Sequence, residues 1–126
     1  MTRFLLICLA GALGTGTRYL VSLGAAKWLP PTFPYGTLIV NLVGCFLIAV
    51  VMQAAIMSSA MSDTTRLTLT TGFMGGLTTY SAFDFELMKL FGDRAWSSGI
   101  TYLLATLVGC FVMGLLGVAA AQRAFG

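Results

Sequence analysis

Residues 67–90 read LTLTTGFMGGLTTYSAFDFELMKL, and this stretch decides how the rest of the chain is interpreted. It is long and apolar enough to cross a membrane as a helix, which takes about 20 residues. Its centre is poor helix sequence, because the glycine pair 75–76 costs roughly 1 kcal/mol per residue against Ala and the β-branched threonine pair 78–79 follows it. The sequence therefore predicts a spanning helix that breaks at about residues 75–79.

A break of this kind has a consequence for assembly. Lipid cannot hydrogen-bond the backbone, so a non-helical segment at membrane depth must be shielded by protein or by an aqueous cavity. The break is therefore expected inside an assembly rather than against acyl chains. Glycines also let neighbouring helices pack closely, and this plainer role for Gly75 and Gly76 stays open on sequence alone.

The remainder of the chain is just as apolar. Hydrophobic residues make up 58% of the 126 residues and charged residues only 9%, whereas soluble domains carry roughly 25% charge. Further apolar segments cover about residues 4–23, 36–57 and 98–121, separated by proline-rich or charged connections. The first also resembles a signal peptide after Arg3, but its apolar pattern continues past Arg18. We predict an all-α membrane protein, a single domain (1–126) of four transmembrane helices.

Several functional classes are disfavoured. The net charge of +3 comes with no basic run, so nucleic acid is not an expected partner and the basic excess is assigned to membrane lipid. Cys8, Cys45 and Cys110 are widely spaced in apolar segments and the chain has no His, so they are interpreted as buried small residues rather than a zinc or redox site. Without a nucleophile–base pair or metal cluster, the sequence does not indicate an enzyme.

Basic residues are almost evenly divided between the two ends of such a bundle. Four spans place both termini on one side, with Arg3, Arg66 and Arg123; the other side holds Lys27, Lys89 and Arg94, and also Arg18 if it reaches the interface. The Lys/Arg difference between short loops sets membrane orientation. A near-zero difference predicts insertion in both directions, and hence an antiparallel, dual-topology homodimer with its site at broken helices near the midplane.

Polar groups inside the spans are the candidate functional residues, because they are costly in lipid. Asn41 offers amide donors on the second helix, either to a ligand or to a structural interhelical bond. Tyr102, Thr106 and Cys110 recur every four residues, so they share one helix face and form a row of weak donors. The alternative for that row is packing, with Thr106 bonded to its own backbone.

The broken helix contributes a second group at and after the break. Thr79 and Ser81 carry hydroxyls, while Tyr80 and Phe83 share a face, and an aromatic edge carries partial positive charge that suits an anion. Asp84 and Glu86 are expected in a wetter mouth with Lys89. Arg18 is a candidate for attracting anions to a vestibule, although headgroup contact or pairing with an acid is the favoured interpretation.

These residues resemble one known family. The run 72–83, GFMGGLTTYSAF, is similar to the signature of the Fluc (CrcB) bacterial fluoride channels, and GALG at 11–14 with Arg18 and GTLIVNLVG at 36–44 support the match. The resemblance covers essentially the whole chain. It implies an antiparallel homodimer in the bacterial inner membrane, and a structural Na⁺ at its centre held by the backbone carbonyls of Gly75 and Thr78, since carbonyl oxygens suit a hard cation.

The resemblance also implies a residue set for the ion path. The fluoride pathway would include Asn41, Thr79, Tyr80, Ser81, Phe83, Tyr102 and Thr106, and the vestibule Arg18, Thr37 and Glu86. Tyr80 departs from the family, which usually has Phe at this position, so its hydroxyl puts the conduction rate in question.

The resemblance thus implies a fluoride-selective channel that lowers cytoplasmic fluoride by passive export. Two alternatives remain from the residues alone: a small dual-topology, proton-coupled multidrug exporter, and a non-conducting membrane assembly subunit. The exporter needs a membrane-embedded carboxylate, which the first helix lacks.

Overall fold

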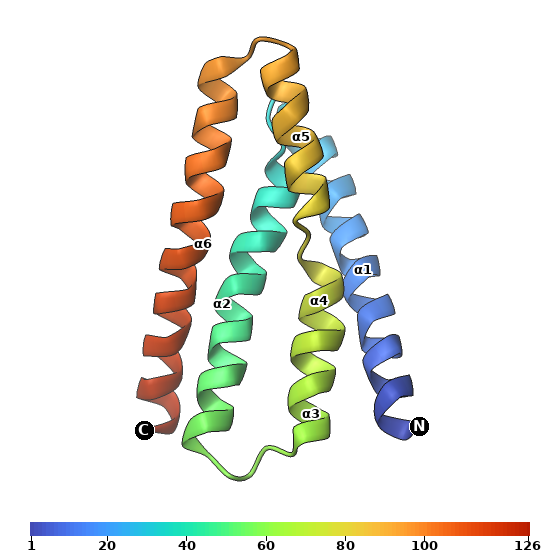
Figure 1. Cartoon of the computed structure of the whole chain (residues 1–126), viewed down its shortest axis with the longest axis vertical. Helices are drawn as coiled ribbons and strands as arrows, with labels where there is room; N and C mark the ends of the chain where they lie inside the picture. The colour runs from blue at the N-terminus through green and yellow to red at the C-terminus, as the bar shows by residue number, and fades with distance from the viewer.

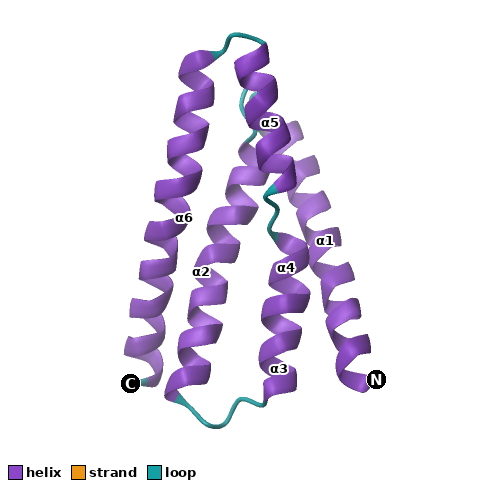
Figure 2. Cartoon of the chain, in the orientation of Figure 1, coloured by secondary structure: helices purple, strands orange, loops and turns teal.

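The computed structural model describes all residues, 1–126, and is helical throughout except at its connections (Figures 1 and 2). Three helices are long and apolar enough to cross a membrane: α1 (Thr2–Trp28), α2 (Tyr35–Met57) and α6 (Trp96–Phe125). The third span is built from shorter pieces: α3 (Asp63–Leu67), η1 (Thr68–Met74), α4 (Gly75–Leu77) and α5 (Ser81–Gly92). The predicted all-α chain of four helices with an interrupted third is confirmed, and most of the helix ends extend a few residues beyond the predicted bounds.

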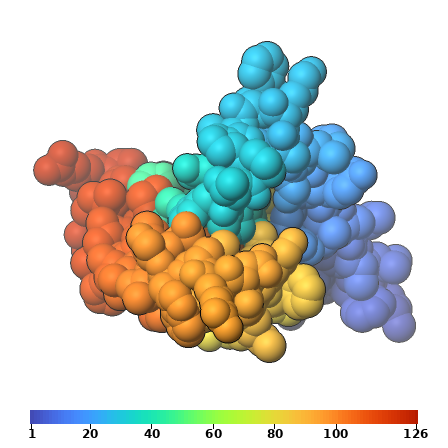
Figure 3. Space-filling model, turned by 90° about the horizontal axis from the view of Figure 1, so that it is seen from above, coloured from blue at the N-terminus to red at the C-terminus, as the bar shows by residue number.

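Both termini lie at one end of the bundle, beside the connection between α2 and α3 (Figure 1). There the Arg3 side chain donates to the Thr64 hydroxyl at 3.1 Å. The opposite end carries residues 29–34 and the α5–α6 turn, and in Figure 3 the cyan connection adjoins both α1 and the orange hairpin. The expected division of Arg3, Arg66 and Arg123 from Lys27, Lys89 and Arg94 therefore holds.

The third span breaks at residues 78–80, slightly beyond the glycines. Thr78 is extended, with φ −87° and ψ 158°, and α5 begins at Ser81. Gly75 and Gly76 are helical. The predicted break at about residues 75–79 therefore overlaps the observed one, which begins just after the glycine pair.

Of the two glycines, Gly76 lies directly against α1. A Cβ on Gly76 would collide with the Gly11 carbonyl oxygen, and one on Gly14 would collide with the Phe73 carbonyl oxygen and lie 2.9 Å from the Leu77 nitrogen. Small residues on both helices thus let the two backbones touch. Gly76 therefore serves close helix packing, the role that the sequence alone left open.

The stretch before the break is a π-helix, which nothing in the sequence predicted. Over Thr68–Met74 the backbone is wound more widely than in an α-helix. The hydroxyls of Thr68 and Thr70 donate to the carbonyls of Thr64 and Arg66, at 2.7 and 2.8 Å. Single π turns inside helices are frequent at functional sites, and this one leads directly into the interruption.

The break lets the third span change neighbours. Its first half, η1 and α4, packs on α1, whereas α5 packs on α6. The central helix α2 contacts both α1 and α6, and Val40 on α2 forms a small core with Met74 and Leu77. Between α2, α6 and the break, the halves diverge and leave a groove.

Replacing Gly14 by Ala should destabilise the protein, because the new methyl group meets backbone that cannot move aside. Overpacking of this kind costs about 1–3 kcal/mol, measurable as unfolding in detergent. Gly16→Ala is the matched control on the same helix: a Cβ there has nothing within 4 Å, and Ala is the better helix former by about 1 kcal/mol. Equal destabilisation by both variants would contradict the close approach of α1.

Candidate functional site

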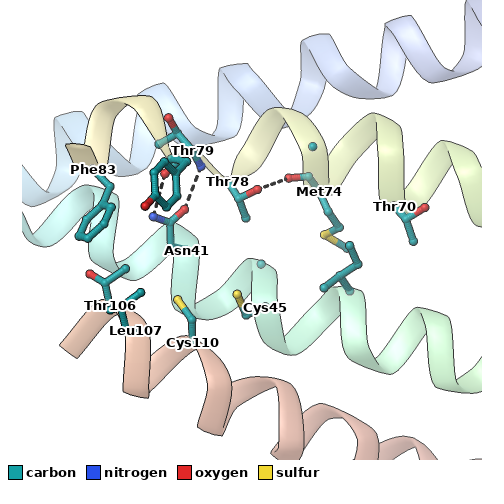
Figure 4. A pocket seen from close by; sticks show the side chains of 14 residues that line it. Asn41, Cys45, Thr70, Met74, Thr78, Thr79, Phe83, Thr106, Leu107 and Cys110 are labelled. Carbon is teal, nitrogen blue, oxygen red and sulfur yellow. Dashed lines mark hydrogen bonds between the residues drawn. The ribbon is translucent and has the colours of Figure 1, made fainter. Parts of the chain in front are cut away.

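The groove encloses about 430 Å³ and is walled by α2, the η1–α4 stretch with its break, and α6 (Figure 4). Its lining contains no charged side chain. Many of the predicted site residues meet here: Asn41, Gly75, Thr78, Thr79, Tyr80, Phe83 and Thr106. The predicted residues Arg18, Thr37, Ser81, Glu86 and Tyr102 lie outside the lining.

Asn41 holds the broken segment in place. Its side-chain N–H donates to the Thr79 carbonyl at 3.0 Å, and its side-chain oxygen accepts from the Thr79 N–H at 2.9 Å (Figure 4). The buried amide thereby pairs both backbone groups of a residue that has left the helix. The structural bond is therefore made, and one further N–H of the amide remains to donate into the groove.

The hydroxyls after the break organise the start of α5. The Thr79 hydroxyl accepts from the Ala82 N–H at 3.2 Å and lies 3.4 Å from the Ser81 hydroxyl. Thr79 thus satisfies one of the free N–H groups at a helix start. Ser81 is exposed in the single chain.

Thr106 is the unusual polar group of α6. Its hydroxyl is buried and has no hydrogen-bond partner. The alternative in which Thr106 bonds its own backbone is therefore wrong. A buried hydroxyl without a partner costs about 1–3 kcal/mol. This oxygen faces the groove (Figure 4), so it is the strongest candidate for contacting an ion there.

Aromatic rings connect the groove to a second cavity. Phe83 is 2% exposed and its ring packs edge-on against that of Tyr102, which is fully buried, with centroids 5.1 Å apart. The Tyr102 hydroxyl donates to the Glu86 carboxylate at 3.3 Å. Tyr80 is 75% exposed and meets Phe83 edge-on at 5.6 Å.

Thr37 and Glu86 line that second cavity, of about 230 Å³, next to the α1–α2 connection. Glu86 also lines a neighbouring cavity together with Lys89 and Asp93. The expectation that Glu86 lies near Lys89 at a mouth fits this arrangement, and Tyr102 lies between mouth and groove.

Arg18 lies beside the helical turn that precedes the break. Its Nε donates to the Gly76 carbonyl at 3.1 Å, across the interface between α1 and α4. It forms no ion pair, since the only one in the chain joins Arg66 to Asp63. Pairing with an acid, one of the favoured roles, is therefore not made. Without Arg18, the basic residues at the two ends number three and three.

The carbonyls assigned to a cation remain unpaired. No backbone N–H donates to the carbonyl oxygen of Gly75 or Thr78. The Thr79 N–H, which would pair with Gly75 in a continuous helix, donates to Asn41, and the Ala82 N–H, which would pair with Thr78, donates to the Thr79 hydroxyl. Two free carbonyls per chain fit the donor set of a hard monovalent cation.

Some lining residues were not singled out from the sequence. Met74 and Thr70 reach the groove from η1, and Cys45 reaches it from α2, opposite Cys110. Thr70 and Met74 belong to the unforeseen π turn. Cys45 carries no signal in sequence, because a single cysteine in an apolar helix is ordinarily packing.

Comparisons with known proteins give one consistent result. A family model described as CrcB-like protein, Camphor Resistance (CrcB), matches residues 5–118. A protein of Anaeromyxobacter sp. (strain K) named fluoride-specific ion channel FluC is 49% identical over 89% of both chains. Proteins of the same name from Sorangium cellulosum and Geobacter sulfurreducens are each 42% identical, and each match covers 98% of this chain and at least 97% of the relative.

Proposed function

We propose, starting from the fact that this chain belongs to the CrcB-like protein family, that it is a fluoride-selective ion channel. It is a multi-pass protein of the bacterial inner membrane and exports fluoride passively; it is not an enzyme. The observation that carries the assignment is the match to curated fluoride channels along nearly the whole chain. This match favours the fluoride channel over the two functions that the sequence left open, the multidrug exporter and the non-conducting subunit.

The ion path is assigned to the groove and its extension to Glu86. Fluoride is small and strongly hydrated, so a pore must replace its water with other donors. The free N–H of Asn41 and the hydroxyls of Thr79, Ser81 and Thr106 are such donors. The edges of Phe83 and Tyr102 add weak positive potential. Several moderate sites of this kind allow an ion to leave as well as to enter.

The mouth of the path is assigned to Thr37 and Glu86. The Tyr102 hydroxyl bonds to Glu86, so its rotation would exchange a carboxylate acceptor for an anion arriving from the groove. Arg18 acts at a distance in this account, as the positive charge behind the break. Tyr80 adds a hydroxyl at the open rim beside Phe83.

The functional unit is a homodimer of antiparallel chains. In the single chain the groove is open on one side, and Tyr80 and Leu107 on its rim are exposed, so a second copy is required to enclose an ion path in lipid. The equal numbers of basic residues at the two ends favour insertion in both orientations.

Dual topology predicts that one surface position faces both sides of the membrane. Ser59 is exposed in the connection between α2 and α3. In intact cells and in inverted vesicles, a membrane-impermeant maleimide should label a Ser59→Cys variant in about equal amounts, since no net Lys/Arg difference selects an orientation. The parent, whose cysteines lie in the spans, is the control. Labelling from one side alone would exclude the antiparallel arrangement.

A structural sodium ion joins the two copies in this proposal. The free carbonyls of Gly75 and Thr78 from each chain would hold it. Exchanging sodium for N-methylglucamine should lower dimer stability, by about 2.7 kcal/mol if sodium is at a hundred times its dissociation constant. Thermal dissociation of the dimer in detergent measures this. Identical transitions in the two salts would remove the sodium from the proposal.

Fluoride efflux from liposomes tests the function itself. Purified protein is reconstituted, valinomycin carries compensating potassium, and a fluoride electrode follows release, with chloride-loaded liposomes in parallel. Rapid loss of fluoride without loss of chloride is expected. If neither ion leaves, a Tyr80→Phe variant decides whether the tyrosine impairs conduction, and silence of that variant as well would refute the channel.

A further inference from the structure

Two cysteines from different helices meet in the wall of the groove. Cys45 lies on α2 and Cys110 on α6, and both are free thiols that are only partly buried. Figure 4 shows their sulfur atoms on neighbouring helices facing the same space, and both side chains line the groove. The third cysteine, Cys8, lies on the outer surface of α1 and not in this groove.

The pair is held by the tight packing of α2 on α6. A Cβ on Gly109, next to Cys110, would lie 2.8 Å from a methyl carbon of Leu42. Farther along α6, a Cβ on Gly117 would collide with the Phe46 carbonyl. These contacts bracket the cysteines and fix the spacing of the two helices that carry them.

The potential metal ligands in this part of the groove are soft sulfur atoms. Met74 brings a thioether to the same groove, while the lining has no carboxylate and the chain has no histidine. Multivalent hard cations prefer carboxylate oxygens, whereas thiolate and thioether ligands suit soft ions. Two thiolates are sufficient for ions that accept two ligands in line.

We propose that Cys45 and Cys110 form a binding site for a soft, thiophilic metal ion of the Cu⁺, Ag⁺ or Hg²⁺ class. Two sulfur–metal bonds form, two S–H bonds break, and both protons leave to water, with no change in oxidation state. Because Thr106 lies one turn before Cys110 on the same face of α6, a metal at the cysteines narrows the groove beside the unpaired hydroxyl. The metal should therefore block fluoride conduction, and this part of the proposal rests on the proposed function.

Mercuric ion is the probe, applied to the full chain in detergent after reduction and removal of the reductant. One equivalent should add one mercury and remove two protons from the intact mass of a single chain. Alkylation with N-ethylmaleimide should then modify Cys8 alone. Cys8→Ser is the matched control, and it should bind the metal equally and take no maleimide.

Cys45→Ser and Cys110→Ser each leave one ligand. Against a competing monothiol, both should hold mercury about a hundredfold more weakly than the parent, since the second contact of a chelate multiplies affinity by about 10²–10⁴. Equal retention by the parent and both serine variants would overturn the site. A mercury-linked species of twice the chain mass would overturn it as well, by placing the bridge between copies.

Conduction separates this site from the proposed function. Mercury should slow fluoride efflux through the parent and through Cys8→Ser, while each serine variant, compared with its own untreated rate, is spared. A protected Cys45–Cys110 pair in a protein that never passes fluoride would refute the channel and keep the site. Normal fluoride efflux with no mass adduct would refute the site and keep the channel.

Discussion

An Asn41→Ala channel is expected to pass fluoride at least about a hundredfold more slowly than the parent. The substitution removes both hydrogen bonds to Thr79, at 3.0 and 2.9 Å, and leaves the N–H and C=O of that residue unpaired. Each unpaired buried group costs about 1–3 kcal/mol. A tenfold change in rate corresponds to about 1.4 kcal/mol, so two such losses, together with a lost donor in the groove, lead to this estimate.

Fluoride efflux from liposomes measures this effect. Gln53→Ala is the matched control, because Gln53 lies on the same helix but outside the groove and makes no side-chain hydrogen bond. Asn41→Asp keeps the acceptor for the Thr79 N–H but loses the donor and adds a negative charge, so it should also conduct poorly. Parent-like flux through Asn41→Ala would show that this account of the path is wrong.

Replacing Thr106 by Val should have two opposite effects. Val has the shape of Thr without the hydroxyl, so the substitution removes a buried polar group that has no partner in the single chain. Relieving that penalty should stabilise the fold by about 1–2 kcal/mol. The same change deletes a donor to the ion and should slow fluoride efflux about tenfold, which is the loss of about 1.4 kcal/mol.

Unfolding in detergent and efflux in liposomes are to be measured on the same preparation. Thr106→Ser, which keeps the hydroxyl, is the control and should retain most of the conduction. If Val lowers stability, the hydroxyl already has a partner in the folded protein. If Val conducts like the parent, Thr106 does not serve the ion.

The architecture could be predicted because its signals are long and local. Four apolar segments and the weak centre of the third are visible in composition and propensity alone. The predicted break at about residues 75–79 overlaps the observed one at 78–80, but Gly75 and Gly76 stay helical, since helix propensity is a weak prior that packing overrides. Here the backbone of α1 lies so close to Gly76 that glycine keeps the helix intact.

The site was harder, because its contacts join residues far apart in the chain. The bond between Arg18 and Gly76 spans 58 residues, and the one between Asn41 and Thr79 spans 38. The set of polar residues that gathers at the site could be predicted from the cost of polar groups in lipid. The hydrogen-bond partner of each residue could not. The π turn leaves no pattern that a period of 3.6 residues would reveal, so Thr70 and Met74 were overlooked.

The interruption of the third span also sets two helix ends of opposite polarity against each other. The stretch that ends at Leu77 presents its carbonyl end, equivalent to roughly −0.5 of an elementary charge, and α5 presents its amide end at Ser81, roughly +0.5. A cation and an anion can thus each find a favourable end within a few residues, in a groove whose lining holds no formal charge. Side-chain substitutions can change the donors of the groove, but this field comes from the backbone and would disappear only if the helix closed.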